Sequence, residues 1–163
     1  MALITRQRIM FRARYKWPQK SVTFSKTEFH PSGYLCNAPG YVSMCWGIPK
    51  HAPRFFGGMS TLAMDSDGWA YEIDPKDMKP GDALGLIGPG SVGTDGGNIV
   101  IFEGWLNDDY LSNYAICWEM LPDASPGPVR RARPYDGTRW HSYRFKDVVE
   151  TELPDGVLRQ PRA

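Results

Sequence analysis

The amino-acid sequence contains no uninterrupted apolar run of the roughly 18 residues that a membrane-spanning helix requires. Its N-terminal region also lacks the continuous apolar core and the small-residue cleavage site of a secretory signal. Basic residues interrupt that region at Arg6, Arg8, Arg12, Arg14 and Lys16. Both absences predict a soluble protein that has no membrane span and carries no export signal.

Cysteine and histidine are scarce, with 3 residues of each, and no two cysteines have CxxC spacing. An odd number of cysteines does not favour a disulfide framework, and so few histidines do not favour a zinc site. We expect Cys36, Cys45 and Cys117 to be small buried or half-buried side chains. The acidic residues after residue 64 lack the spacing of a calcium-binding loop. The sequence therefore predicts no metal and no cofactor.

Net charge is almost absent, since the 19 Lys and Arg residues are nearly balanced by 18 Asp and Glu residues. A formal charge of +1 argues against a dedicated nucleic-acid-binding protein. The charges are nevertheless segregated along the chain. Residues 1–27 carry bases and no acid, residues 65–82 are mostly acidic, and residues 130–146 are rich in arginine. Solvated surfaces explain the two basic segments at least as well as phosphate contacts do.

The remaining composition is typical of one folded domain. Of the 163 residues, 42% are hydrophobic and 13% aromatic, an aromatic content that disordered chains lack. The 17 glycines and 14 prolines indicate many loops. No internal repeat is visible, so we interpret residues 1–150 as a single domain and residues 151–163 as a C-terminal tail.

An amphipathic helix is predicted near the N-terminus. Residues 4–17 place Ile9, Ala13 and Trp17 four positions apart, which puts them on one face of a helix. The helix is expected to begin near Thr5 and to end before the proline that follows Trp17.

A second helix, short and buried, is predicted at residues 40–46, which are mostly apolar. Asn37 is a suitable cap, and Pro39 fits the first turn of a helix. Gly47 is expected to end this helix, because glycine readily adopts the left-handed conformation found after helices.

Beyond residue 60 the pattern changes to short strand-like segments separated by turns. The turn Pro80-Gly81-Asp82 is expected to precede an apolar strand. The predicted strands are residues 61–64, 69–73, 83–87, 98–105, 114–120, 128–135 and 141–145. Residues 98–105 and 114–120 are expected to be antiparallel neighbours. Helices followed by a sheet predict an α+β fold.

Gly88, Gly90 and Gly93 match the GxGxxG pattern of dinucleotide-binding proteins. That site requires a helix directly after the glycines, whose amides hold the pyrophosphate. Here the glycines lead into the predicted strand at residues 98–105. A long flexible loop explains them, so no nucleotide is expected.

Several segments carry a resemblance that spans most of the chain. In order, they are ITRQRIMFRARYKW (4–17), VTFS (22–25), YLCNAPGYVSMCW (34–46), MKPGD (78–82), GNIVIFEGW (97–105) and YAICWEM (114–120). Their order resembles the NlpC-type cell-wall cysteine peptidases, especially the single-domain type of actinobacteria and their phages. The corresponding family motifs read YRTDCSGYVSMAW, LKPGD and GHVVIFxxW. This resemblance implies a papain-like NlpC-type fold, with N-terminal helices packed on an antiparallel sheet.

The resemblance also implies the positions of three catalytic groups: a cysteine at a helix start, a histidine on a strand and a polar residue that orients the histidine. Those positions hold Ala38, Asn98 and Glu119 here. Alanine has no nucleophile, and an amide is not a useful base near neutral pH. We therefore expect no catalytic residues and interpret the chain as a pseudoenzyme of a cysteine peptidase (peptidoglycan endopeptidase) family.

A relocated cysteine–histidine pair is a less favoured alternative, which would make the chain an active cell-wall endopeptidase. Cys36 lies two residues before Ala38, and Cys45 lies two helical turns after it, about 10 Å along the axis. Three histidines lie outside the position of the family's base: His30, His51 and His141.

A structural role is the favoured interpretation of such an inactive domain. The chain would be a component of a phage virion, at the tail tip, and would dock on other virion proteins. It has two candidate docking surfaces. One is the segment of residues 130–133, and the other is the helix that bears Arg6, Arg8, Arg12 and Arg14. It would be made in the host cytoplasm, and a bacterial cytoplasmic protein is the alternative.

A binding role is the second interpretation. The chain would hold a peptidoglycan stem peptide without cutting it, in the cleft that the family uses for its substrate. The residues expected to line that cleft are Tyr41, Trp46, Asn98, Trp105 and Glu119.

Overall fold

A computed structural model describes residues 3–17, 22–52, 55, 57–58, 61–86, 98–120 and 127–150. In chain order the elements are β1 (Ile4–Thr5), α1 (Arg6–Phe11), the π-helix η1 (Arg12–Lys16), α2 (Ala38–Trp46), α3 (Thr61–Ser66), β2 (Ala70–Glu72), the 3-10 helix η2 (Pro75–Asp77), β3 (Ala83–Leu86), β4 (Ile99–Trp105), the 3-10 helices η3 (Leu106–Asp108) and η4 (Tyr110–Ser112), β5 (Tyr114–Glu119), β6 (Val129–Pro134), β7 (Trp140–Phe145) and β8 (Val148–Val149). This mixture of helices and antiparallel strands confirms the α+β class. Among the described helices, none has the length and apolar character needed to cross a membrane.

The first helix begins where the sequence predicts. The Thr5 hydroxyl caps it by accepting a hydrogen bond of 3.1 Å from the Arg8 amide. Ile9, Ala13 and Trp17 are each 0% exposed, which confirms the predicted buried face. The last turn is a π-helix rather than an α-helix. Within this π-helix the Ala13 carbonyl accepts a hydrogen bond of 2.6 Å from the Tyr41 hydroxyl.

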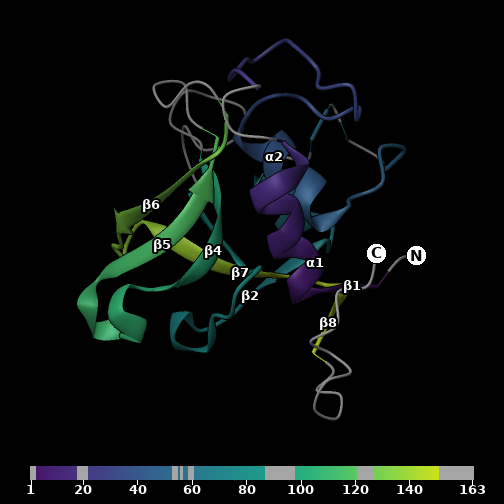
Figure 1. Cartoon of the computed structure of the whole chain (residues 1–163). Helices are drawn as coiled ribbons and strands as arrows, with labels where there is room; N and C mark the ends of the chain where they lie inside the picture. The colour runs from purple at the N-terminus through teal and green to yellow at the C-terminus, as the bar shows by residue number, and fades with distance from the viewer. Residues whose placement is uncertain are drawn as a thin grey trace, which may run out of the picture.

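Helix α2 also matches its prediction. The Asn37 side chain accepts a hydrogen bond of 2.8 Å from the Gly40 amide, and Pro39 lies in the first turn. Gly47, with a φ of 75°, ends the helix in the left-handed conformation. Helices α1 and α2 lie side by side against the sheet (Figure 1).

The sheet has six strands in the order β2-β7-β3-β4-β5-β6, and every pair of neighbours is antiparallel. The pairing of β4 with β5 confirms the expected neighbours, with an irregularity between Phe102 and Gly104. Strands β2 and β6 form the two edges of this sheet.

Two parts of the fold differ from the prediction. Residues 61–64 were expected to be a strand, but they belong to the helix α3, which Gly68 follows with a φ of 76°. A short apolar run does not distinguish a buried strand from a buried helix by its periodicity. The parallel pair of β1 with β8 was not predicted, because two-residue strands leave no pattern in a sequence.

The sheet carries a hydrophobic core on each of its faces. On the side of α1 and α2, the core includes Ile99 and Ile101 of β4. On the opposite side, Val100 and Phe102 of the same strand pack with Cys117 of β5. Successive side chains of a strand point to opposite faces, so the alternating apolar residues of β4 separate the two cores.

A buried carboxylate joins the N-terminal helix to the sheet. Asp82, which is 1% exposed, accepts charged hydrogen bonds from Arg6 and Arg144 and one from the Lys79 amide. Glu150 forms ion pairs with Arg6 and Lys79 at the same place. This cluster connects α1, the turn before β3, β7 and the residue after β8.

The predicted glycine-rich loop at Gly88, Gly90 and Gly93 lies outside the described residues, and so does the predicted tail at residues 151–163.

Candidate functional site

Ala38 is the first residue of α2, at the position to which the resemblance assigns a nucleophile. It is 5% exposed and belongs to the core on the helix side of the sheet. The first turn of α2 is tightly packed. A Cβ on Gly58 would lie 2.6 Å from the Gly40 Cα, and a Cβ on Gly40 would collide with the Leu35 carbonyl. The position therefore presents only a methyl group inside a close-packed helix start.

Asn98 and Glu119 lie on the other face of the sheet. Asn98 precedes β4 and lines a cavity of about 390 Å³ together with Arg133 and Trp140. Glu119 is 0% exposed and accepts hydrogen bonds of 3.2 and 2.6 Å from Arg133. The Arg133 guanidinium also lies 4.9 Å from the centre of the Trp140 ring. Arg133 therefore binds Glu119 and lines the same cavity as Asn98.

No hydrogen bond from the described residues holds the amide oxygen of Asn98 as the family's polar residue would hold its histidine. Its Oδ1 is buried and accepts no hydrogen bond from the described residues. The buried carboxylate of Glu119 is instead paired with arginines, since Arg131 adds an ion pair of 3.4 Å to the contacts of Arg133. Of the three positions that the resemblance assigns, Asn98 and Glu119 lie on one side of the sheet, whereas Ala38 packs in the core on the opposite side.

The residues expected to line a cleft are divided by the sheet. Tyr41 and Trp46 are 0% and 1% exposed in the helix-side core, where the Trp46 Nε1 donates to the Gly81 carbonyl at 2.9 Å. Trp105 packs on the other side against Phe102, Tyr110 and Tyr135. The five residues therefore do not form one groove. The sequence could not show this, because it does not reveal which residues of α2 face the sheet.

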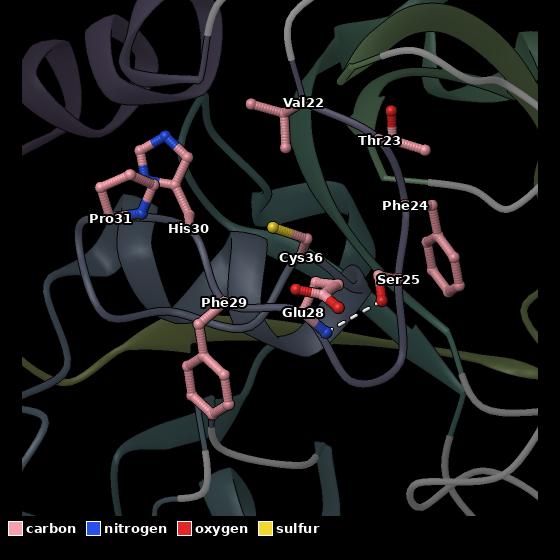
Figure 2. A pocket seen from close by; sticks show the side chains of 9 residues that line it. All are labelled: Val22, Thr23, Phe24, Ser25, Glu28, Phe29, His30, Pro31 and Cys36. Atoms are coloured by element: carbon pink, nitrogen blue, oxygen red, sulfur yellow. Dashed lines mark hydrogen bonds between the residues drawn. The ribbon is translucent and has the colours of Figure 1, made fainter.

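A second cavity, of about 320 Å³, lies beside the start of α2 (Figure 2). Its lining residues are Val22, Thr23, Phe24, Ser25, Glu28, Phe29, His30, Pro31 and Cys36. A compact loop builds it, since the Cys36 amide donates to the Glu28 carbonyl at 3.0 Å and the His30 amide donates to the Tyr34 carbonyl at 2.8 Å. The cavity thus gathers a thiol, an imidazole and a carboxylate, of which the sequence prediction had not considered Glu28.

The electrostatic environment of this cavity leaves both the thiol and the imidazole neutral. Burial and the nearby Glu28 carboxylate raise the pKa of Cys36. Burial and the charge of Lys16 lower the pKa of His30. The His30 Nδ1 lies 2.7 Å from the Ser32 hydroxyl, and its ring stacks on Trp17. A thiolate is the reactive form of cysteine, so this arrangement does not activate Cys36.

The other candidates for a relocated pair are held elsewhere. Cys45 and Cys117 are free, buried thiols, and burial strongly raises the pKa of each. His141 lies 2.9 Å from Glu72 on the strands β7 and β2, and His51 is exposed. The prediction that all three cysteines are buried or half-buried is confirmed, since each is buried.

The arginines predicted as a docking surface are largely engaged within the chain. Arg6 binds Asp82, and Arg12 donates to the Cys45 carbonyl at 3.4 Å. Arg14 and Arg130 share the Glu103 carboxylate.

Charges around Glu103 hold its pKa at about 2, because hydrogen bonds from Arg130 and Trp118 favour the ionised form. Glu103 of β4 therefore connects η1 to β6 through two arginines of the predicted basic surface.

The described residues contain no group of three or more histidine, cysteine, aspartate or glutamate side chains that could hold a metal ion. No protein-family model, curated protein or solved structure matches this chain.

Proposed function

We propose that this chain is a catalytically inactive, papain-like domain of the NlpC type and that it serves as a structural component of a phage virion, at the tail tip. The observation that carries the proposal is Ala38 at the start of α2, where the resembling enzymes have their nucleophile. The phage tail as its location follows from the resemblance to the single-domain enzymes.

The helix start is preserved although its chemistry is absent. Asn37 caps α2 through its side chain, and Pro39 fits the first turn. A proline has no amide N–H, so this position cannot donate a hydrogen bond to an oxyanion. The sequence thus retains the architecture of the helix start without a nucleophile and with one backbone donor fewer.

The remaining thiols do not replace the nucleophile. Cys36 is the one cysteine that lines a described cavity, and its raised pKa keeps it protonated near neutral pH. Cys45 and Cys117 are each 0% exposed. An enzyme that used one of them would need a large rearrangement of the core.

Exposed apolar side chains support a role in an assembly. Leu3, Phe11, Tyr15 and Leu111 are between 55% and 77% exposed. Such side chains are available for contact with other proteins.

The first test is digestion of diaminopimelate-type peptidoglycan, with released peptides followed by mass spectrometry. We expect no release by the natural protein. Three variants accompany it: Ala38→Cys with Asn98→His, which restores the family residues; Cys36→Ser, which removes the thiol of the cavity; and Gly104→Ala, a neutral control. Release by the natural protein that Cys36→Ser abolishes would overturn the proposal and support a relocated pair.

Two further measurements separate the proposed role from its alternatives. Sedimentation with intact peptidoglycan detects a domain that binds stem peptides without cutting them, and retention there would favour that alternative. Antibodies against the chain are expected to label one end of the tail in purified particles. Particles that lack the chain would contradict the virion assignment.

A further inference from the structure

One side of the N-terminal helix exposes aromatic rings among basic residues. Phe11 and Tyr15 are 55% and 62% exposed, and their ring centres lie 5.1 Å apart. Residues four apart lie on the same face of a helix, opposite in this case to the buried Ile9 and Ala13. We call Phe11, Tyr15 and the flanking cations Arg8, Arg14 and Lys16 the basic aromatic surface.

This surface remains positive after its internal contacts are counted. Residues 3–17 contain five basic residues and no acidic one. Arg14 shares the single Glu103 carboxylate with Arg130, so that cluster has an excess of one positive charge. Arg8 and Lys16 add their charges beside it.

A second surface has the opposite sign. Residues 65–77 contain five acidic residues and one base. The five are exposed: Asp65, Asp67, Glu72, Asp74 and Asp77. Tyr71 belongs to the same segment and is 49% exposed. We call these six residues the acidic edge.

The acidic edge lies at one end of the sheet. Strand β2, which carries Tyr71 and Glu72, pairs with β7 and is the first strand in the sheet order, so its outer side has no partner strand among the described residues. An unpaired edge strand offers backbone groups to a second chain.

We propose that the basic aromatic surface of one copy of this chain binds the acidic edge of a second copy. The basic aromatic surface offers two exposed rings and the acidic edge offers Tyr71, and the prevailing charges of the two surfaces have opposite signs. Because the two surfaces differ, each copy carries both halves of the contact. Such contacts close into a small ring or extend into a longer array. The inference adds a partner to the structural role proposed above and rests on it.

A second copy fits the charge distribution better than a polyanion does. A nucleic acid or an anionic lipid surface would match the basic aromatic surface but would be repelled by the acidic edge. The formal net charge of +1 gives no overall attraction to either. A copy of the same chain uses both surfaces.

The test measures the molecular mass of the full chain by light scattering and sedimentation over a range of protein concentrations. We expect association that increases with concentration and weakens as salt is added, because salt screens exposed charges. A protein that stays monomeric throughout would overturn the inference.

Two variants each disable one surface. Phe11→Ser with Tyr15→Ser removes the aromatic rings, and Asp65→Lys with Asp77→Lys reverses charge at the acidic edge. Each variant alone is expected to weaken association on the order of tenfold or more. A mixture of the two is expected to recover association, because each variant retains the surface that the other lacks. Failure of the mixture to associate would overturn the pairing.

Leu111→Ser is the matched control, since Leu111 is 77% exposed and lies outside both surfaces. Circular dichroism confirms that every variant is folded. If Leu111→Ser weakens association as much as the other variants do, the inference is wrong. A monomeric protein that leaves peptidoglycan intact would overturn this inference alone, whereas released peptides would overturn the inactive-domain proposal in any assembly state.

Discussion

Arg144 of β7 binds the carboxylate of Asp82 through two hydrogen bonds of 3.1 and 2.9 Å. The two side chains are 14% and 1% exposed, so the pair is almost shielded from water. Arg6 donates a further hydrogen bond of 2.9 Å to the same carboxylate. A carboxylate this deeply buried requires such partners, because an unpaired buried charge is strongly destabilising.

Asp82→Asn is expected to lower the free energy of unfolding by about 3 kcal/mol, because it removes the buried anion that Arg6 and Arg144 share and leaves them the more exposed Glu150 as their anionic partner. Urea denaturation measures the change. Glu150→Gln is the control: Glu150 pairs with the same Arg6 but is 40% exposed, and exposed pairs contribute less than about 1 kcal/mol. Equal losses of unfolding free energy in the two variants would contradict the conclusion that Asp82 stabilises the fold more than Glu150 does.

Glu103 is expected to make stability depend on acid pH. Its pKa in the folded chain is about 2, below the ordinary glutamate value of about 4.3. A depressed folded pKa contributes stability that is complete above the ordinary value and is lost as the pH falls towards the folded value.

Glu103→Gln should therefore reduce the loss of stability between about pH 4 and pH 2. Thermal unfolding across this pH range provides the measurement. An unchanged pH profile in the variant would show that Arg130 and Trp118 do not act through this carboxylate.

Native thiol reactivity is expected to be slow and confined to Cys36. The Cys36 thiol lines a cavity, whereas Cys45 and Cys117 are 0% exposed in the cores. Burial raises the pKa of all three, so little thiolate forms near neutral pH. A thiol reagent should modify one cysteine of the folded protein and three after denaturation. Rapid modification that persists in Cys36→Ser would refute this assignment.

Gly40→Ala is expected to disrupt the start of α2. A methyl group there would collide with the Leu35 carbonyl, and overpacking of this kind costs about 3 kcal/mol. Gly104→Ala is the matched control, since nothing lies within 4 Å of its added Cβ. The control should change the free energy of unfolding by less than about 1 kcal/mol. Similar melting temperatures for the two variants would contradict the packing described for α2.

Local signals in the sequence determined much of the secondary structure. The four-residue spacing of Ile9, Ala13 and Trp17 identified the first helix, and Asn37 with Gly47 marked both ends of α2. The β4 and β5 strands followed from their apolar residues and the turn between them. Each of these features depends on neighbouring residues, so one sequence suffices to recognise it. The absence of cysteine and histidine from the positions to which the resemblance assigns catalytic groups was also visible there.

Only the tertiary structure decided which of these residues meet. It separated Tyr41 and Trp46 from Trp105 by placing the sheet between them. It joined Glu119 to Arg133 and brought Cys36, His30 and Glu28 around one cavity. The tertiary structure also pairs Arg6 with Asp82, so that arginine is not available in the predicted docking surface. Contacts between residues distant in the chain depend on strand order and on which face each side chain takes, and local periodicity specifies neither.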